Sequence, residues 1–350
     1  MMFIWRWAKR LIAGVLLVVL GLLTPVAYSE VMCRPSGEPA AAQALLAAEH
    51  HRLESRTLLT YPEWYIVHAY QDYARVIETG DPHDYRFIKG ISGFWRSLCA
   101  LSKTSGQLGP VDGATKQMVY VIGFSFTAEL LAKAAYEETL GRVFTTLRGP
   151  QRAALDDLSA AQAKGYAAFL QQTPWYKWDF DADAKALRDA GAGQMRDQER
   201  RFALGLEYGV KAAYARVIAA AVAEVGGDAL TLRMIVDGAD GNTLAQFSGV
   251  TVIGETPSGI EIETLRYRAL THLIKDMTEA GVSFVEIAGN DDIMFTIISE
   301  AATHPKAMYS DKRQGFENYR HLLLTDVAEL AADIAGLAET SARLEHIHDY

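Results

Sequence analysis

An uncharged apolar segment near the start of the chain constrains its fold more than any other feature. Leu11 to Tyr28 contains no charged side chain and is dominated by leucine and valine. A helix needs about 20 apolar residues to cross a bilayer. Lys9 and Arg10 precede the segment, and such a positive flank stays in the cytoplasm. We therefore expect a single-pass helix in the inner membrane of a bacterial-type envelope, with the body of the chain in the periplasm.

The same segment, residues 1–29, also fits a cleavable signal peptide. Ala27-Tyr28-Ser29 supplies small residues where a signal peptidase cuts. The length of the apolar run and the nearby Trp5 and Trp7 favour an uncleaved anchor, because tryptophan prefers the interface between membrane and water. Both interpretations place the body outside the cytoplasm.

Composition and charge exclude several classes of function. The 350 residues are 50% hydrophobic and 22% charged, which is enough for a sizeable core and about two domains. The net charge is -9 and no stripe of lysine and arginine is present, so nucleic acid is not an expected partner. Because fingerprints for dinucleotides and phosphate loops are absent, we predict no nucleotide and no cofactor. Histidine and cysteine spacing predicts no metal site.

Two cysteines, Cys33 and Cys99, leave two possibilities open. In an oxidising compartment they can form a disulfide that ties the segment after the anchor to the first helices. Two unpaired thiols, with Cys99 simply buried, fit the sequence equally well.

Helical patterns dominate residues 30–227. We divide this part into a spacer with a first helix from Ala40 to about Ser55, within residues 30–59, and an all-helical domain over residues 60–227. Thr60 and Glu63 have the spacing of a capping box, and Pro62 suits a first helical turn, so a helix is expected to begin there. Further helices are expected over residues 81–98, 115–147, 157–172 and 195–225.

The first half of the longest expected helix is unusually apolar. Met118 to Ala128 carries few side chains with a polar group. This stretch is too short on its own to span a membrane. We therefore expect it to be buried on nearly all sides.

The pattern changes after Asp228 to short β-like runs, which gives an α+β fold class for the whole chain. Strands are expected over residues 230–236, 250–253 and 260–267, followed by a helix over residues 269–279. Val282 to Ile287 and Ile293 to Ile298 flank a turn and resemble a hairpin. Asn318 to about Arg343 is rich in leucine and alanine and predicts a C-terminal helix. Residues 228–350 are thus expected to form a small antiparallel α+β sandwich.

Two long helices carry the same polar triplet. Glu129, Lys133 and Tyr136 recur at identical offsets as Glu207, Lys211 and Tyr214. If the helices pack antiparallel, Glu129 meets Lys211 and Glu207 meets Lys133, with the two tyrosines capping the network. Buried carboxylates beside lysines suit acid–base chemistry, but structural networks have the same composition.

A histidine on an aromatic helix is a second candidate for chemistry. His68 and Asp72 are four residues apart, and an aspartate that orients a histidine is a known catalytic arrangement. Tyr70 lies between them in the sequence. We expect Tyr70, with Tyr136 and Tyr214, to line any ligand pocket in the helical domain. The alternative for His68 is a hydrogen-bonded core histidine.

Two aromatic or histidine-rich segments have weaker assignments. Trp175 and Trp178 belong to a loop with four aromatic residues, which suits contact with lipid headgroups or packing over the helical core. His346-Ile347-His348-Asp349 resembles an adventitious metal-binding tail, and terminal tails are usually mobile.

No catalytic signature is present, so binding is the favoured class of function. We expect a membrane-anchored protein that binds a protein partner, a lipid or another apolar ligand. The alternative is an envelope enzyme that uses the Glu/Lys/Tyr groups and His68. These classes separate on whether the charged groups line an open pocket or close on themselves.

Overall fold

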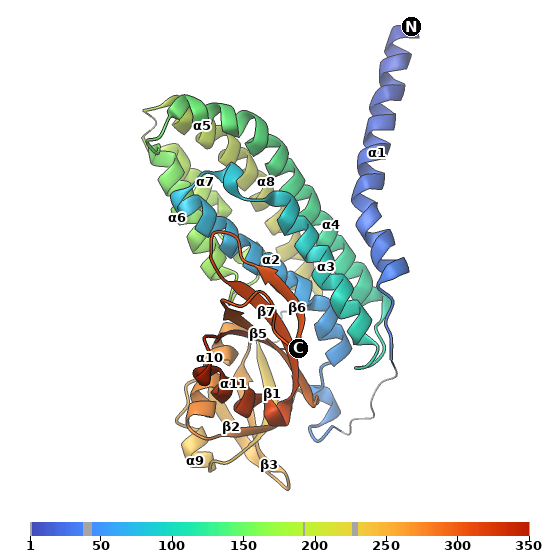
Figure 1. Ribbon diagram of the computed structural model, residues 1–350, viewed down its shortest axis with the longest axis vertical. Helices are drawn as coiled ribbons and strands as arrows, with labels where there is room; N and C mark the ends of the chain where they lie inside the picture. Colours follow the sequence, from blue (N-terminus) through green and yellow to red (C-terminus); the bar gives the residue numbers. More distant parts are fainter. Residues whose placement is uncertain (1, 38–43, 192, 226–229, 350) are drawn as a thin grey trace.

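The computed structural model describes residues 2–37, 44–191, 193–225 and 230–349. It contains a projecting N-terminal helix, a helical bundle and two four-stranded antiparallel sheets (Figure 1). This mixture of helices and antiparallel sheets confirms the predicted fold class at that level.

Two helical segments are long and apolar enough to cross a membrane, judged by length and composition alone. One is Ile12–Met32, the 21 residues that form the C-terminal part of α1 (Met2–Met32). The other is Gly113–Arg148, a helical segment of 36 residues. The first agrees with the expected anchor helix, whereas the second is unexpected. Trp5 is exposed on α1, and the side chain of Trp7 lies outside the described part of the chain.

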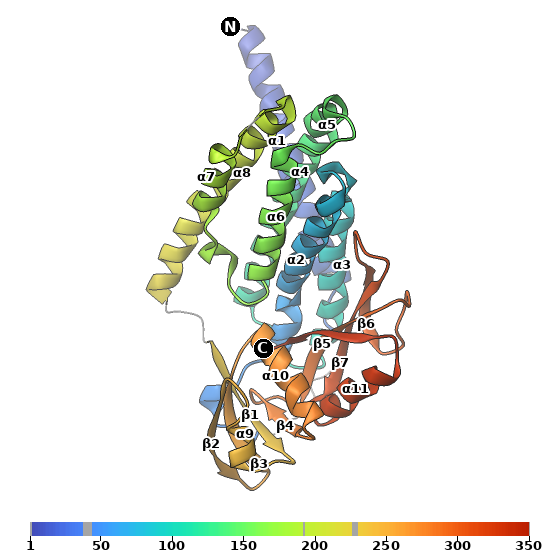
Figure 2. The same cartoon turned by 90° about the vertical axis from the view of Figure 1, so that its left-hand side faces the viewer.

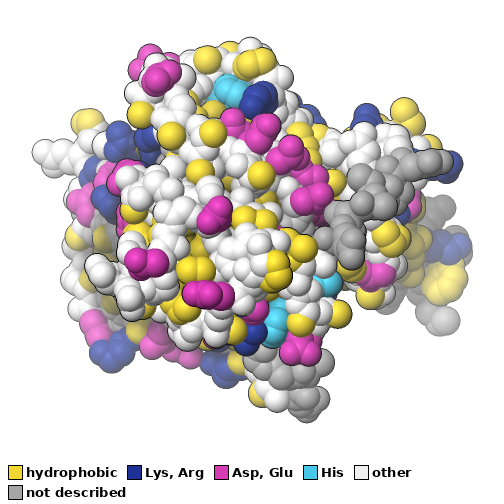
Figure 3. Space-filling view, turned by 90° about the horizontal axis from the view of Figure 1, so that it is seen from below, with side chains coloured by type: hydrophobic (Ala, Val, Ile, Leu, Met, Phe, Trp, Pro, Cys, Tyr) yellow, Lys and Arg dark blue, Asp and Glu magenta, His cyan; other side chains and the backbone are white. Residues whose placement is uncertain are grey.

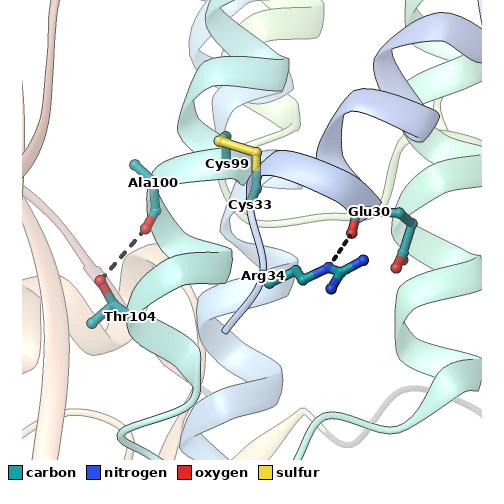
Figure 4. Close-up of a disulfide and its surroundings, with 6 residues drawn as sticks. All are labelled: Glu30, Cys33, Arg34, Cys99, Ala100 and Thr104. Carbon is teal, nitrogen blue, oxygen red and sulfur yellow. Dashed lines mark hydrogen bonds between the residues drawn. A yellow bond between two sulfur atoms is a disulfide. The ribbon is translucent and has the colours of Figure 1, made fainter. Parts of the chain in front are cut away.

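A disulfide joins the end of α1 to the bundle. Cys33 bonds Cys99, closing a sequence separation of 66 residues (Figure 4). Nearby, the hydroxyl of Tyr120 donates a hydrogen bond to Glu30 Oε1 at 2.6 Å. Of the two possibilities for the cysteines, the structure therefore contains the bonded one.

The bundle is arranged around α2, which contacts α3, α4 and α6. Its helices are α2 (Glu54–Thr79), α3 (Phe87–Ser105), α4 (Gly113–Tyr136), α5 (Arg142–Arg148), α6 (Ala154–Phe169), α7 (Phe180–Asp189) and α8 (Met195–Val225). A π-helical turn, Glu137–Gly141, joins α4 to α5 without a break. The long helices expected over residues 115–147 and 195–225 are thereby confirmed, and the glycines expected to end the second lie outside the described residues.

The predicted start of α2 is wrong. The helix begins at Glu54, so Pro62 lies inside it rather than in its first turn, and no capping box forms at Thr60. Burial of Leu58 and Leu59 in the bundle core explains the extension, because tertiary packing outweighs a local capping signal. The helix expected from Ala40 is also wrong over residues 44–53, which hold only a short 3₁₀ helix; residues 38–43 lie outside the described chain.

Each sheet is antiparallel. The first has the order β2 (Val250–Thr256), β3 (Gly259–Leu265), β1 (Thr231–Asp237), β4 (Ser283–Ile287). The second has the order β6 (Ala307–Lys312), β7 (Tyr319–Asp326), β5 (Asp292–Ser299), β8 (Arg343–His348). Helices α9 (Gly241–Leu244), α10 (Arg268–Glu279) and α11 (Leu330–Gly336) connect the strands.

The second sheet packs on both of its faces. Phe295 and Ile347 belong to a core shared with the first sheet, α10 and α11. Met294 and Leu322 belong instead to the core of the bundle. Because side chains alternate along a strand, the sheet is held between the two cores, at one end of the bundle (Figure 2).

Two predictions for residues 228–350 are wrong. The expected hairpin does not form, because β4 and β5 belong to different sheets and the chain crosses between them. The expected C-terminal helix over residues 318–343 is broken up: β7 takes its first part, and short helical segments follow, of which only α11 is α-helical. The central strand β7 is buried on both faces, so its run of leucines lacks the alternation that marks a half-exposed strand.

Candidate functional site

The charged pairs expected between the two long helices are present. Lys211 Nζ lies 2.8 Å from Glu129 Oε1 and 2.9 Å from Glu207 Oε1. Lys133 Nζ lies 3.0 Å from Glu207 Oε1. The order of these pairs shows that α4 and α8 run antiparallel. We call Glu129, Lys133, Glu207 and Lys211 the ion-pair ladder.

The three candidate tyrosines do not line a common pocket. Tyr70 donates a hydrogen bond to Glu129 Oε1 at 2.8 Å and so joins the ladder. Tyr136 instead donates to Glu199, and Tyr214 packs against Trp175. The expected capping by Tyr136 and Tyr214 is therefore absent. Each follows its lysine by three residues, which turns it about 60° around the helix away from the ladder.

The ladder is closed. The cavity beside it has a volume of only about 30 Å³, and its wall contains Lys133, Glu207 and Lys211. A cavity of this size has room for about one or two water molecules. The ladder thus has the geometry of a structural network, because its charges contact one another rather than an open space.

A second buried network, which the sequence reasoning missed, continues the ladder along α8. Arg200 is 1% exposed and donates to Glu137 Oε1 at 2.8 Å and to Glu199. Arg196 donates to Asp156 Oδ1 at 2.9 Å. The π-helical turn contains Glu137, which faces Arg200. The charge run from Arg196 to Arg201 is the only sequence signal, and such a run usually indicates a solvated surface.

His68 and Asp72 are both buried but contact different partners. His68 Nε2 lies 3.9 Å from Glu345 Oε2, and Asp72 accepts a hydrogen bond from the Gln314 backbone N–H at 2.7 Å. Burial holds the pKa of His68 well below its ordinary value and raises that of Asp72 to about 6. The expected orientation of His68 by Asp72 is therefore not formed.

The aromatic loop folds back onto the bundle. The indole N–H of Trp178 donates to Asp183 Oδ2 at 2.7 Å, and Trp175 packs near Phe180. Of the two arrangements expected for this loop, the structure contains the one in which it packs over the helical core. Contact of Trp175 and Trp178 with a membrane stays a prediction.

A large cavity lies where the bundle meets the first sheet. Its volume is about 840 Å³, within the range of about 300–1,000 Å³ typical of ligand sites. We call it the junction cavity. It is lined by Glu49, His50, His51, Arg52, Leu53, Arg56, Thr57, Thr60, Tyr61, Glu63, Trp64, Met118, Thr231, Leu232, Arg233, Glu263, Arg266, Tyr267, His348 and Asp349.

His348, one of the lining residues, has unpaired polar atoms in its ring. It is 1% exposed, yet neither ring nitrogen has a hydrogen-bond partner among the described residues. Its ring lies between Tyr61, at 4.9 Å between centroids, and Trp64, at 5.6 Å. Burial lowers the pKa of His348 well below its ordinary value, so the ring is neutral and offers one donor and one acceptor. Unsatisfied buried groups cost about 1–3 kcal/mol each.

The tail that contains His348 differs from the expected mobile segment. His346 and His348 are buried, and β8 pairs with β5 through residues 343–348. Alternation along the strand places both rings on the face toward α2, where His346 stacks on Trp64. The spacing that suggested an adventitious metal site therefore serves to bury two imidazoles.

The charged side chains of the junction cavity divide into paired and unpaired groups. Arg233 pairs with Glu261 at 2.8 Å and Arg266 pairs with Asp349. Arg56, by contrast, is exposed and makes no ion pair among the described residues. Burial raises the pKa of Glu63 to about 7, against the opposing effect of Arg56.

Two further groups of side chains come close enough to hold a metal ion. Glu54, Asp291 and Asp292 form one, and a second surrounds His83. Within the first, Glu54 already accepts a hydrogen bond from the Asp292 backbone at 2.9 Å. Local hydrogen bonding accounts for this group, and we assign no metal to it.

Comparisons with known proteins add no functional information. No protein-family model, no curated protein and no solved structure matches the chain.

Proposed function

We propose that this chain is a membrane-anchored protein that binds a small organic anion in the junction cavity, on the periplasmic side of a bacterial-type inner membrane. One observation carries the proposal. The cavity has the volume of a ligand site, and among the described residues its lining includes an exposed arginine with no ion-pair partner and a buried histidine whose ring nitrogens make no hydrogen bond.

The location rests on α1 and the disulfide. Lys9 and Arg10 precede the apolar segment, and a positive flank orients such a helix with its N-terminus in the cytoplasm. Cys33 and Cys99 then lie on the opposite side of the membrane. A disulfide between them fits that oxidising compartment.

The ligand class follows from the lining of the cavity. The guanidinium of Arg56 is suited to pair with a carboxylate or phosphate group. Burial raises the pKa of Glu63 to about 7, so its protonated form, which can donate to an anionic oxygen, is populated near neutral pH. Tyr61 and Trp64 provide aromatic contacts for the carbon skeleton of the ligand. This polar lining favours an anion over the apolar ligand expected from composition.

The ion-pair ladder has no adjoining space for a substrate, which argues against the hypothesis that it is an enzyme site. Lys133, Glu207 and Lys211 adjoin a cavity of about 30 Å³, which is far below the few hundred Å³ typical of a ligand pocket. The junction cavity is therefore the better candidate for any activity of this chain.

Calorimetric titration of the full chain in lipid nanodiscs tests the proposal. Citrate and glycerol 3-phosphate serve as anionic probes and glucose as a neutral probe. We expect at least one anion to bind and glucose not to bind. Arg56→Ala should weaken anion binding at least about tenfold, because a charge-assisted hydrogen bond contributes about 1.5–3 kcal/mol.

The matched control is Arg188→Ala, which removes an exposed arginine on α7, outside the cavity. It should leave anion affinity unchanged. Failure of both anions to bind, or equal affinity of the wild type and Arg56→Ala, would contradict the proposal.

A further inference from the structure

The outer sides of α4 and α8 carry exposed apolar stripes. On α4, Val121 is 53% exposed, and on α8, Val210 is 63% exposed. The large apolar side chains of the two stripes are Met118, Val121 and Leu131 on α4, and Phe202, Leu206, Val210, Tyr214 and Val217 on α8. This corrects the expectation that Met118 to Ala128 is buried on nearly all sides.

The stripes carry no charge over most of their length. Between Gln117 and Ala135 every exposed residue of α4 is uncharged, and the same holds on α8 between Phe202 and Tyr214. The end of the molecule that carries the sheets is different, because acidic, basic and apolar side chains are interspersed there (Figure 3). An uncharged apolar surface of this length is unusual on a water-exposed helix.

Both stripes point to the same side of the bundle. The ion-pair ladder lies between the antiparallel helices. Leu130 on α4 and Tyr208 on α8 point to one side of the ladder, into the cores. Val121 and Val210 lie on the other side of their helices. We call the two stripes together the α4–α8 face.

Helix α1 is fixed at the base of α4. Val26 packs against the core of the bundle, and Lys116 Nζ lies 3.5 Å from Glu30 Oε1. From this joint, α1 and α4 extend in the same direction, with α1 beside the bundle (Figure 1). The chain runs toward the joint in α1 and away from it in α4. A bilayer that surrounds α1 therefore also reaches the level of α4.

We propose that the α4–α8 face contacts the acyl chains of the bilayer next to α1. The proposal rests on α1 being the membrane anchor. The 24 residues of α4, at a rise of about 1.5 Å each, span roughly the 30 Å of a hydrocarbon core. The uncharged apolar face matches acyl chains, and it borders the apolar helix α1.

The placement of charge supports the same surface. Ionisable groups at membrane depth pair with one another and face the interior of a bundle. Glu129 and Lys211 do so in the ladder, and Glu137 and Arg200 do so in the buried network. On the opposite side of the bundle, α6 exposes Asp157 to solvent. We expect this side of the bundle to face water.

Spin labels on the full chain test this inference. The native cysteines are joined, so single cysteines introduced by Val121→Cys, Val210→Cys, Leu16→Cys and Ala161→Cys are labelled selectively. Leu16 reports on α1, and Ala161, exposed on α6, is the water-facing control. The protein is placed in vesicles of phosphatidylethanolamine and phosphatidylglycerol. Power-saturation measurements compare collisions with oxygen, which dissolves in lipid, and with a water-soluble nickel chelate.

We expect the labels at Val121, Val210 and Leu16 to collide with oxygen and not with nickel, and the label at Ala161 to collide with nickel. Nickel access at Val121 and Val210, with Leu16 still in lipid, would overturn the inference and leave the anchor intact. Nickel access at Leu16 would overturn the anchor and, with it, this inference. Low collision with both reagents and spin–spin broadening at Val210 would show a second copy on the face instead of lipid, which also overturns the inference.

Discussion

The ion-pair ladder and the junction cavity contain similar residue types but differ in how their polar atoms are satisfied. In the ladder, Lys211 contacts two carboxylates and the adjoining space is about 30 Å³. In the junction cavity, the ring of His348 makes no hydrogen bond within the described part of the chain, and the space is about 840 Å³. Charged residues that satisfy one another hold helices together, whereas the exposed guanidinium of Arg56, which lines a large space, is open to a ligand.

The largest loss of stability is expected when the buried network around Arg200, which continues the ladder along α8, is broken. Arg200→Ala leaves Glu137 and Glu199 buried without their shared partner. Breaking a buried pair in this way costs about 3–5 kcal/mol of unfolding free energy, which denaturant unfolding measures. Arg188→Ala, the exposed control, should change stability by less than about 0.5 kcal/mol. Equal stability of Arg200→Ala and Arg188→Ala would contradict the claim that the buried, paired charges hold the helices together.

The second-largest loss of stability is expected when the disulfide is removed. Cys33→Ser opens a loop of 66 residues, and loss of such a bridge costs about 2–4 kcal/mol. Reductant should lower the melting temperature of the wild type to that of the variant and leave the variant unchanged. Because the bridge lies outside the junction cavity, citrate affinity should not change. A variant as stable as the wild type would show that the bridge does not hold α1 to the bundle.

Within the ladder, Glu207→Ala is the sharpest test. It removes the carboxylate shared by Lys133 and Lys211. Both lysines are largely buried, so we expect a loss of about 2 kcal/mol, between the values for exposed and fully buried pairs. Thermal unfolding measures it, and Glu207→Gln should fall between the alanine variant and the wild type. Unchanged stability of Glu207→Ala would contradict a structural role for the ladder.

The smallest effect is expected from pH at the junction cavity. The pKa of Glu63 is about 7 in the fold, against about 4.3 when unfolded. Between these values the native state binds more protons, so the contribution of Glu63 to stability falls as pH rises from about 4.3 to about 7. Glu63→Gln should remove this decline and be more stable than the wild type above neutral pH. Parallel melting curves from about pH 4 to about pH 8 would contradict the assignment.

The sequence predicts those features that depend on local periodicity. The antiparallel ladder follows from Glu and Lys recurring four residues apart on two long helices. Strand β3 and helix α10 follow from alternation and helical spacing close to their observed bounds. In contrast, β7 is buried on both faces, so its apolar residues form a continuous run. Such a run is also typical of a helix rich in leucine, so the sequence alone does not distinguish the two.

The junction cavity depends on contacts between distant segments. Arg56, Thr60 and Glu63 follow one another at helical spacing, which is the only local signal of the site. Arg233 and His348 come from strands of two different sheets and meet these residues only after folding. Glu63 was assigned to a capping box by its local pattern, and only the longer α2 directs it into a cavity.

Thermal unfolding with and without citrate, applied to Arg56→Ala and Glu207→Ala side by side, separates a binding cavity from a structural ladder. We expect Arg56→Ala to melt like the wild type and to lose the stabilisation by citrate, whereas Glu207→Ala should melt at a lower temperature and keep that stabilisation. The reverse result, in which Glu207→Ala alone loses the response to citrate, would place the binding site at the ladder and overturn the assignment of the junction cavity.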